Sequence, residues 1–207
     1  MRGRGPTPPP GPDPFADGLP PLDGARVRLR APRAGDAADV LAVFGDAGHL
    51  RYWSHGPLAS LDAARAYVDG IGAGWRERRL FQWAVTEPPA DRLVGTVTLV
   101  DWDREHRRAE VGFILHPAHA GRGLATDAVR TALRFAVAEM GLHRVEADVD
   151  PANAASLRLL ERLGFRREGV LRERWFTFGT WKDSVVLGLL AADLAGGAGE
   201  GGAGEGG

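Results

Sequence analysis

The feature that most constrains the fold is a Gly-x-Gly turn between a strand-like segment and a long helix-forming segment. The strand-like run 109–115 ends just before this turn, and a helix is predicted to open at Gly121 and to run to about Met140. The first amides of a helix have no intrahelical partner, and the helix dipole adds partial positive charge there. Gly121 and Gly123 let the backbone approach a ligand, and Arg122 adds a charge-assisted contact. The turn therefore predicts a binding site for a pyrophosphate.

A plain turn between a strand and a helix has the same pattern, so the two glycines alone leave both interpretations open. A dinucleotide-binding site would need a third glycine at position 126 and an acid after the next strand. Position 126 is Thr126, whereas Asp150 does follow the next predicted strand. The dinucleotide pattern is therefore only half met.

The rest of the chain alternates strand-like and helix-like segments, which predicts a mixed sheet with flanking helices. Strands are expected where apolar and polar residues alternate, or where Val, Thr and Trp gather. Helices are expected behind capping residues such as Ser60 and Asn153. The predicted strands are 27–30, 81–86, 93–102, 109–115, 144–149, 165–171 and 184–190, and the predicted helices are 36–44, 60–79, 121–140 and 153–163.

The two ends of the chain differ in composition from its middle. Residues 1–22 are rich in proline and glycine, and residues 196–207 consist of Gly, Ala and Glu. Such segments cannot bury enough apolar surface to offset the entropy lost on ordering, so both are expected to be disordered. Residues 23–195 are expected to form one domain, a normal size for a chain of 207 residues.

Composition excludes several classes of function. The net charge of −1 creates no field that attracts nucleic acid, and no apolar run approaches the about 20 residues of a membrane span. The chain has no cysteine and one lysine, Lys182, which removes an acyl-cysteine intermediate and nearly all Schiff-base candidates. His116 and His119 lack a third ligand, so no metal site is expected. We expect a cytoplasmic monomer or homodimer that binds neither nucleic acid nor membrane.

A second candidate site opens the predicted helix 153–163. Asn153 is a strong N-cap, and Ser156 lies three positions on, in the first helical turn. Helix capping and an inert hydroxyl would account for both residues. Their spacing alone therefore assigns neither of them to chemistry.

Five segments, in this order, together resemble the GNAT superfamily of N-acetyltransferases, and more narrowly its branch of ribosomal-protein N-terminal acetylases, the Rim-type enzymes. The resemblance covers residues 23–194. The chain departs from the pattern at Ala118, where the superfamily often carries Gln or Arg, and at Ala120, where the branch often carries Gln. The segments that carry the resemblance are Arg28–Pro32, Glu110–Leu115, His116–Thr126, Asn153–Phe165 and Gly179–Val185.

The resemblance implies an α+β (mixed α/β) fold. Its central sheet would be mixed but largely antiparallel, with about seven strands, a splayed parallel pair in the middle and about four flanking helices. The implied cofactor is acetyl-CoA, with its pantetheine arm in the gap between the splayed strands. The implied cofactor-binding residues are Phe113, Ile114, Leu115, Gly121, Arg122, Gly123, Leu124, Ala125, Thr126, Asn153 and Ser156.

The resemblance also implies an enzyme in which an amine attacks the thioester directly. Glu110 is expected to accept the proton of the ammonium through a water molecule, as a general base. Ser156 is expected to donate a hydrogen bond to the leaving thiolate. The alternatives are a carboxylate at a strand end, paired with Arg107 or Arg108, and a hydroxyl without a role.

The acceptor amine is less well defined by the sequence. Tyr52, Trp53, Trp83 and Trp102 fall in loops or strand ends that the family uses for substrate, although such aromatic residues often belong to the core. A protein or peptide α-amino group, with a pKa of about 7.7–8.0, needs little activation and is the preferred acceptor. The alternatives are a small amine, such as an antibiotic or a polyamine, and a sensor that binds acyl-CoA without catalysis.

Overall fold

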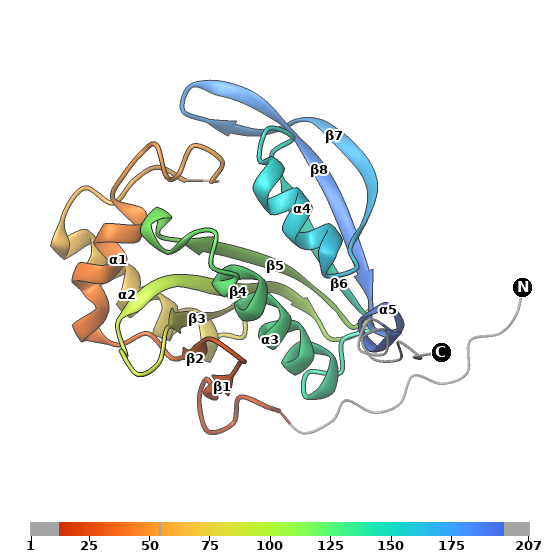
Figure 1. Cartoon of the computed structure of the whole chain (residues 1–207), viewed down its shortest axis with the longest axis horizontal. Helices are drawn as coiled ribbons and strands as arrows, with labels where there is room; N and C mark the ends of the chain where they lie inside the picture. Colours follow the sequence, from red (N-terminus) through yellow and green to blue (C-terminus); the bar gives the residue numbers. More distant parts are fainter. Residues whose placement is uncertain (1–12, 54, 197–207) are drawn as a thin grey trace, which may run out of the picture.

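The computed structural model of the chain describes residues 13–53 and 55–196. One eight-stranded sheet runs through this part, in the order β1-β2-β3-β4-β5-β6-β8-β7 (Figure 1). All neighbouring strands are antiparallel except β5 and β6, which confirms the predicted mixed α/β architecture. The strands are β1 (Leu22–Asp23), β2 (Arg28–Arg30), β3 (Leu80–Thr86), β4 (Leu93–Asp103), β5 (Arg108–Leu115), β6 (Arg144–Val149), β7 (Arg166–Thr177) and β8 (Thr180–Leu190). The helices are α1 (Ala37–Phe44), α2 (Leu61–Arg76), α3 (Leu124–Ala138), α4 (Ala154–Arg162) and α5 (Ala191–Gly196).

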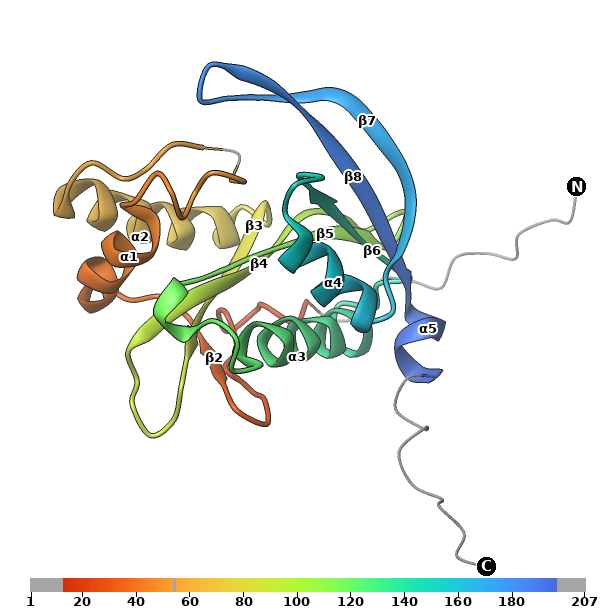
Figure 2. The same ribbon diagram turned by 45° about the horizontal axis from the view of Figure 1, so that its top comes forward.

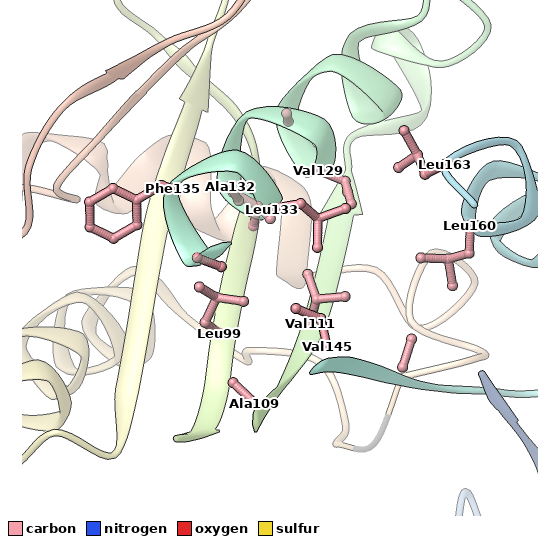
Figure 3. Packing of buried hydrophobic residues seen from close by; sticks show 14 of the residues in the cluster. Leu99, Ala109, Val111, Val129, Ala132, Leu133, Phe135, Val145, Leu160 and Leu163 are labelled. Atoms are coloured by element: carbon pink, nitrogen blue, oxygen red, sulfur yellow. The ribbon is translucent and has the colours of Figure 1, made fainter. Parts of the chain in front are cut away.

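Helices cover both faces of the sheet, which explains why its central strands are apolar on both sides. α1 and α2 form a cluster on one face that includes Phe44 and Val68. α3 lies on the opposite face, where Val129 and Leu133 point toward β4 and β5 (Figure 3). Residues 81–86 of β3 are all buried, as expected for a strand covered on both sides. Each fully buried aliphatic side chain stabilises the fold by about 1.5–3 kcal/mol relative to exposure.

The parallel strands β5 and β6 separate after a short paired stretch. Their pairing ends where Glu110 lies opposite Glu146. Beyond that point β5 stays paired with β4 and β6 stays paired with β8. The inner edges of residues 111–115 and 147–149 therefore have no strand partner in the described structure. This separation is the splayed parallel pair that the resemblance implied. Such edges present backbone N–H and C=O groups that an extended ligand can satisfy. This opening is called the fork below.

The strands β7 and β8 form a long hairpin that arches away from the sheet (Figures 1 and 2). The predicted strands 165–171 and 184–190 cover only the base of this hairpin. All residues of β7 except Thr177 are exposed, so the sequence has no pattern of buried and exposed positions from which its length could be predicted.

The ordered part of the chain begins earlier than the predicted boundary at Asp23. Phe15 is fully buried and stacks on Phe81, with ring centroids 4.0 Å apart. Asp13 pairs with Arg78. Residues 13–22 thus pack on the domain because one aromatic side chain finds a site in the core. Residues 1–12 and 197–207, which hold the rest of the two predicted disordered ends, lie outside the described residues.

The helices α3 and α4 both begin beside the fork. α3 begins at Leu124 and not at the predicted Gly121, because Gly121 and Gly123 have φ angles of +73° and +78°, outside the helical region. α4 begins after Asn153, whose side chain accepts a hydrogen bond from the backbone N–H of Ser156, as its predicted capping role requires. No helix in the described part of the chain is long and apolar enough to cross a membrane.

Candidate functional site

A cavity of about 920 Å³ occupies the fork between β5 and β6. The separated strands form its floor, and α4 and the β7–β8 hairpin contribute to its wall. A cavity of this size suits a large cofactor together with part of a substrate. It is lined by residues in 49–53, 110–115, 117–126, 147–162 and 175–183.

The Gly-x-Gly turn gives one end of this cavity a site for an anion. Gly121 and Gly123 both line the cavity, and both adopt the left-handed conformation that glycine tolerates best. The hydrogen bond from the Asp127 N–H to the Gly123 carbonyl is the first of α3. The amides of residues 124–126 precede it and have no intrahelical acceptor. With the helix dipole, these amides can hold a pyrophosphate.

Arg122 lies outside this lining. Its guanidinium pairs with Glu87, with 2.9 Å between Nη1 and Oε2. The Arg122 carbonyl accepts a hydrogen bond from Arg26. A contact between Arg122 and a phosphate would therefore require the exposed pair with Glu87 to open. Exposed pairs of this kind contribute only about 0.2–1 kcal/mol, so opening costs little.

Glu110 lies at the apex of the fork and lines the cavity. Burial, together with the negative charges of Asp148, Asp101 and Glu146, raises the pKa of Glu110 to about 7, against a smaller lowering effect of Arg174. Within the described structure no cation forms an ion pair with Glu110. The carboxylate is thus tuned to exchange a proton near neutral pH, as a general base requires.

The structure does not bear out the alternative in which Glu110 is a strand-end carboxylate paired with its arginine neighbours. Arg107 donates to the Gly141 carbonyl. Arg108 pairs with Asp103 and Glu146.

The start of α4 brings Asn153 and Ser156 to the side of the cavity opposite β5. Asn153 uses its side-chain oxygen to cap the helix, which leaves its amide nitrogen available to a ligand. Ser156 is half-buried, and its hydroxyl has no partner within the described residues. The structure thus brings the predicted residues Phe113, Ile114, Leu115, Gly121, Gly123, Leu124, Ala125, Thr126, Asn153, Ser156 and Glu110 together around one cavity.

Only two of the four aromatic residues predicted to bind substrate line the cavity. Tyr52 and Trp53 do so, from the loop that precedes α2. The prediction is wrong for Trp83, which is fully buried and donates its indole N–H to the Pro20 carbonyl, 2.8 Å away. It is also wrong for Trp102, whose ring packs edge-on against Phe81 away from the cavity.

The β6 strand and the hairpin supply cavity residues that the sequence did not reveal. Asp148 of β6 accepts hydrogen bonds from Ser184 and from the Trp175 indole, the latter at 3.0 Å. Lys182 of β8 donates to the Arg51 carbonyl at 2.7 Å and so joins the hairpin to the loop 49–53. The alternation of β6, with polar Glu146 and Asp148 between buried neighbours, was the one signal that could have indicated Asp148. The hairpin residues had none.

Comparison with known proteins gives the same result as the geometry. A family model described as an acetyltransferase (GNAT) domain matches residues 26–166. The uncharacterized N-acetyltransferase YoaA of Bacillus subtilis is 30% identical over 172 residues, which are 83% of this chain and 97% of that protein. The structure of Mycobacterium smegmatis RimJ in complex with CoA-disulfide superposes with a TM-score of 0.76 at 26% identity, covering 84% of this chain and 88% of that one. Spermidine N-acetyltransferase from Vibrio cholerae, in complex with CoA and spermine, gives 0.73 at 25% identity, covering 83% and 99%.

The residues around the cavity fit the group that these proteins bind. Two unpaired strand edges can take up the amide groups of a pantetheine arm, and the turn with its free helix amides can take up a pyrophosphate. Acetyl-CoA is accordingly the co-substrate of this enzyme. The chain belongs to the GNAT family of N-acetyltransferases.

Proposed function

We propose that this acetyltransferase acts on the α-amino group of a protein or peptide, as the Rim-type branch does, with Glu110 as its general base. The observation that carries the proposal is the pKa of about 7 at Glu110, at the apex of the fork. An α-amino group has a pKa of about 7.7–8.0, so about a third of it is neutral at pH 7.5. A lysine-type amine, with a pKa of about 10.4, is neutral in only about one molecule in a thousand at that pH.

This difference in acceptor pKa sets how much work the base must do. Transfer of a proton from an α-ammonium group to Glu110 is uphill by about one pKa unit, or about 1.4 kcal/mol. Transfer from a lysine-type ammonium group is uphill by about 4–5 kcal/mol. A carboxylate with a pKa of about 7 is therefore better matched to an N-terminus.

The reaction requires only groups already placed around the cavity and the thioester. Glu110 takes one proton from the ammonium, through a water molecule. The neutral nitrogen attacks the thioester carbonyl, and the resulting intermediate collapses with loss of the CoA thiolate. Ser156 donates a hydrogen bond to that sulfur as its charge develops. The nitrogen then loses its second proton, which passes through solvent to the thiolate. The products are an acetylamide and the CoA thiol, Glu110 is left protonated, and no covalent enzyme intermediate is involved.

The proposed contacts of acetyl-CoA follow the walls of the fork. The backbone of residues 113–115 would pair with the pantetheine amides on one side, and Asn153 would reach the arm from the other. The amides of residues 121–126 would hold the pyrophosphate, with Arg122 joining after release from Glu87. Tyr52 and Trp53 would contact the acceptor.

A small polycationic amine is the second candidate acceptor. The carboxylates of Glu110, Asp148, Asp150 and Asp183 all line the cavity and would attract more than one ammonium group. A spermidine N-acetyltransferase is among the structurally similar proteins. Three cations, Arg51, Arg162 and Lys182, line the same cavity and offset this field, which is why the peptide acceptor is preferred.

The test is a panel of amines incubated with acetyl-CoA while release of the CoA thiol is followed. The panel contains peptides with free Ser, Ala or Thr N-termini, the same peptides with blocked N-termini, polyamines and aminoglycosides. Because the chain has no cysteine, the enzyme itself contributes no thiol signal. Release with free but not with blocked peptides supports the proposal, and release with polyamines alone supports the second candidate. Binding of acetyl-CoA without turnover on any amine would refute both.

A further inference from the structure

We infer that Asp148 is a second functional carboxylate of the site, which binds the acceptor ammonium and orients it toward the thioester beside Glu110. This inference rests on the proposed function in one respect, namely that the acceptor is an amine that attacks within the fork.

The strand register places Asp148 just inside the fork. Along β6, Glu146 and Asp148 alternate with buried residues, so their side chains share one face of the sheet. Glu110 lies opposite Glu146 in the last pair of β5 and β6. Asp148 is the next residue on that face, about 7 Å further along β6. Glu110 and Asp148 both line the cavity, so an acceptor nitrogen bound at Glu110 also has Asp148 as a neighbour.

Hydrogen bonds hold the Asp148 carboxylate in one position. Its Oδ1 accepts hydrogen bonds from the Ser184 hydroxyl and the Trp175 indole. The side chain is only 10% exposed. Among the described residues it forms an ion pair only with Arg174, whose side chain is half-exposed and whose Nε lies 3.5 Å from Oδ2. A nearly buried carboxylate is costly unless a cation compensates it fully, and the acceptor ammonium would complete this compensation.

The two carboxylates would divide the work. Asp148 accepts an N–H of the incoming ammonium with Oδ2, the oxygen that takes neither the Ser184 nor the Trp175 hydrogen bond, and thereby fixes the direction of the nitrogen. Glu110 then removes the proton that blocks the lone pair. The charged groups that act on Glu110 come from each packed element: Asp101 from β4, Glu146 and Asp148 from β6, and Arg174 from β7. Asp148 gives the largest of these charge effects, so it also keeps the pKa of Glu110 near neutral.

The test compares Asp148→Asn with the wild-type enzyme over a range of pH. The amide keeps the shape of the side chain and both incoming hydrogen bonds but removes its charge. We expect the acceptor KM to rise at least about tenfold, in line with a lost hydrogen bond to a charged group, while the acetyl-CoA KM stays within about twofold. The acidic limb of kcat/KM should move to lower pH, because Glu110 loses a negative neighbour.

The control is Glu173→Gln, which removes one negative charge from an exposed position on β7 outside the cavity lining. It should leave both KM values and the acidic limb unchanged. If Asp148→Asn proves unstable, Trp175→Phe removes one hydrogen bond to Asp148 and keeps an aromatic ring. It should raise the acceptor KM about threefold, with no effect on acetyl-CoA.

The outcomes separate the inference from the proposed function. A wild-type enzyme that acetylates no amine refutes the proposed function and this inference with it. An active wild-type enzyme whose Asp148→Asn variant keeps the acceptor KM and the acidic limb refutes only the inference. Equal loss of affinity for acceptor and acetyl-CoA would show a structural role for Asp148 and refute the inference as well.

Discussion

Replacement of Glu110 by glutamine should slow the enzyme and at the same time stabilise it. The carboxylate has lost hydration at the apex of the fork, and its pKa is raised from 4.5 to about 7. The folded state thus favours the protonated form. The stability that this group contributes is complete below about pH 4.5 and is lost as the pH rises through 7. Glutamine is neutral at every pH, so the Glu110→Gln variant keeps this stability as the pH rises.

The size of both effects follows from the pKa of Glu110. The difference between 4.5 and about 7 corresponds to at most about 3 kcal/mol of stability at pH 8. Because Glu110 remains in contact with solvent, screening reduces this to about 1–2 kcal/mol. Loss of a general base lowers the rate by about 10²–10⁴-fold. In the wild-type enzyme the ionised fraction of Glu110 falls about tenfold between pH 8 and pH 6.

Two measurements test these expectations on the same pair of proteins. Urea unfolding at pH 5 and pH 8 should show that Glu110→Gln gains stability over the wild type mainly at pH 8. The ratio of wild-type to variant kcat/KM should rise with pH through 7, since the titration of the acceptor itself is common to both proteins. A variant with the full rate would show that Glu110 is not the base. A stability difference independent of pH would show that its pKa is not raised.

Three further predictions address the remaining parts of the site and the fold. Ser156→Ala should lower kcat about tenfold without changing the acetyl-CoA KM, and an unchanged kcat in single-turnover assays would remove Ser156 from the mechanism. Gly123→Val should raise the acetyl-CoA Kd at least about fivefold, because a branched residue at φ +78° costs about 1–2 kcal/mol. A calorimetric titration that finds unchanged affinity would contradict the proposed pyrophosphate site. Phe15→Ala should lower the free energy of unfolding by about 3–5 kcal/mol, and a loss below about 1 kcal/mol in urea would show that residues 13–22 add nothing to the core.

The features that the sequence predicted well are those with a local physical cause. Gly121 and Gly123 indicate a backbone conformation that other residues adopt at a cost, and both have it. Asn153 indicates a helix start through its own side chain, and α4 begins there. The fork followed from the resemblance, and the strand register confirms it at Glu110.

The features that were missed depend on distant parts of the chain. Trp83 has the composition of a substrate-binding residue, but the packing of Pro20 and the core around it decides its burial. Asp148 is an ordinary polar residue in a strand until the hairpin brings Trp175 and Ser184 to it. Phe15 lies in a segment whose average composition predicts disorder, whereas a single side chain anchors it. Neither average composition nor local sequence pattern can predict these long-range contacts.

The contact between Lys182 and the Arg51 carbonyl can be followed by chemical labelling. Lys182 is the only lysine in the chain, so an amine-reactive fluorophore has one side-chain target, at the wall of the cavity. Its ammonium bridges β8 and the loop 49–53 and lies 3.7 Å from Asp150. Reagents will therefore reach it fastest when the hairpin and the loop move apart. The rate of modification of the Lys182 side chain therefore reports how often the cavity opens.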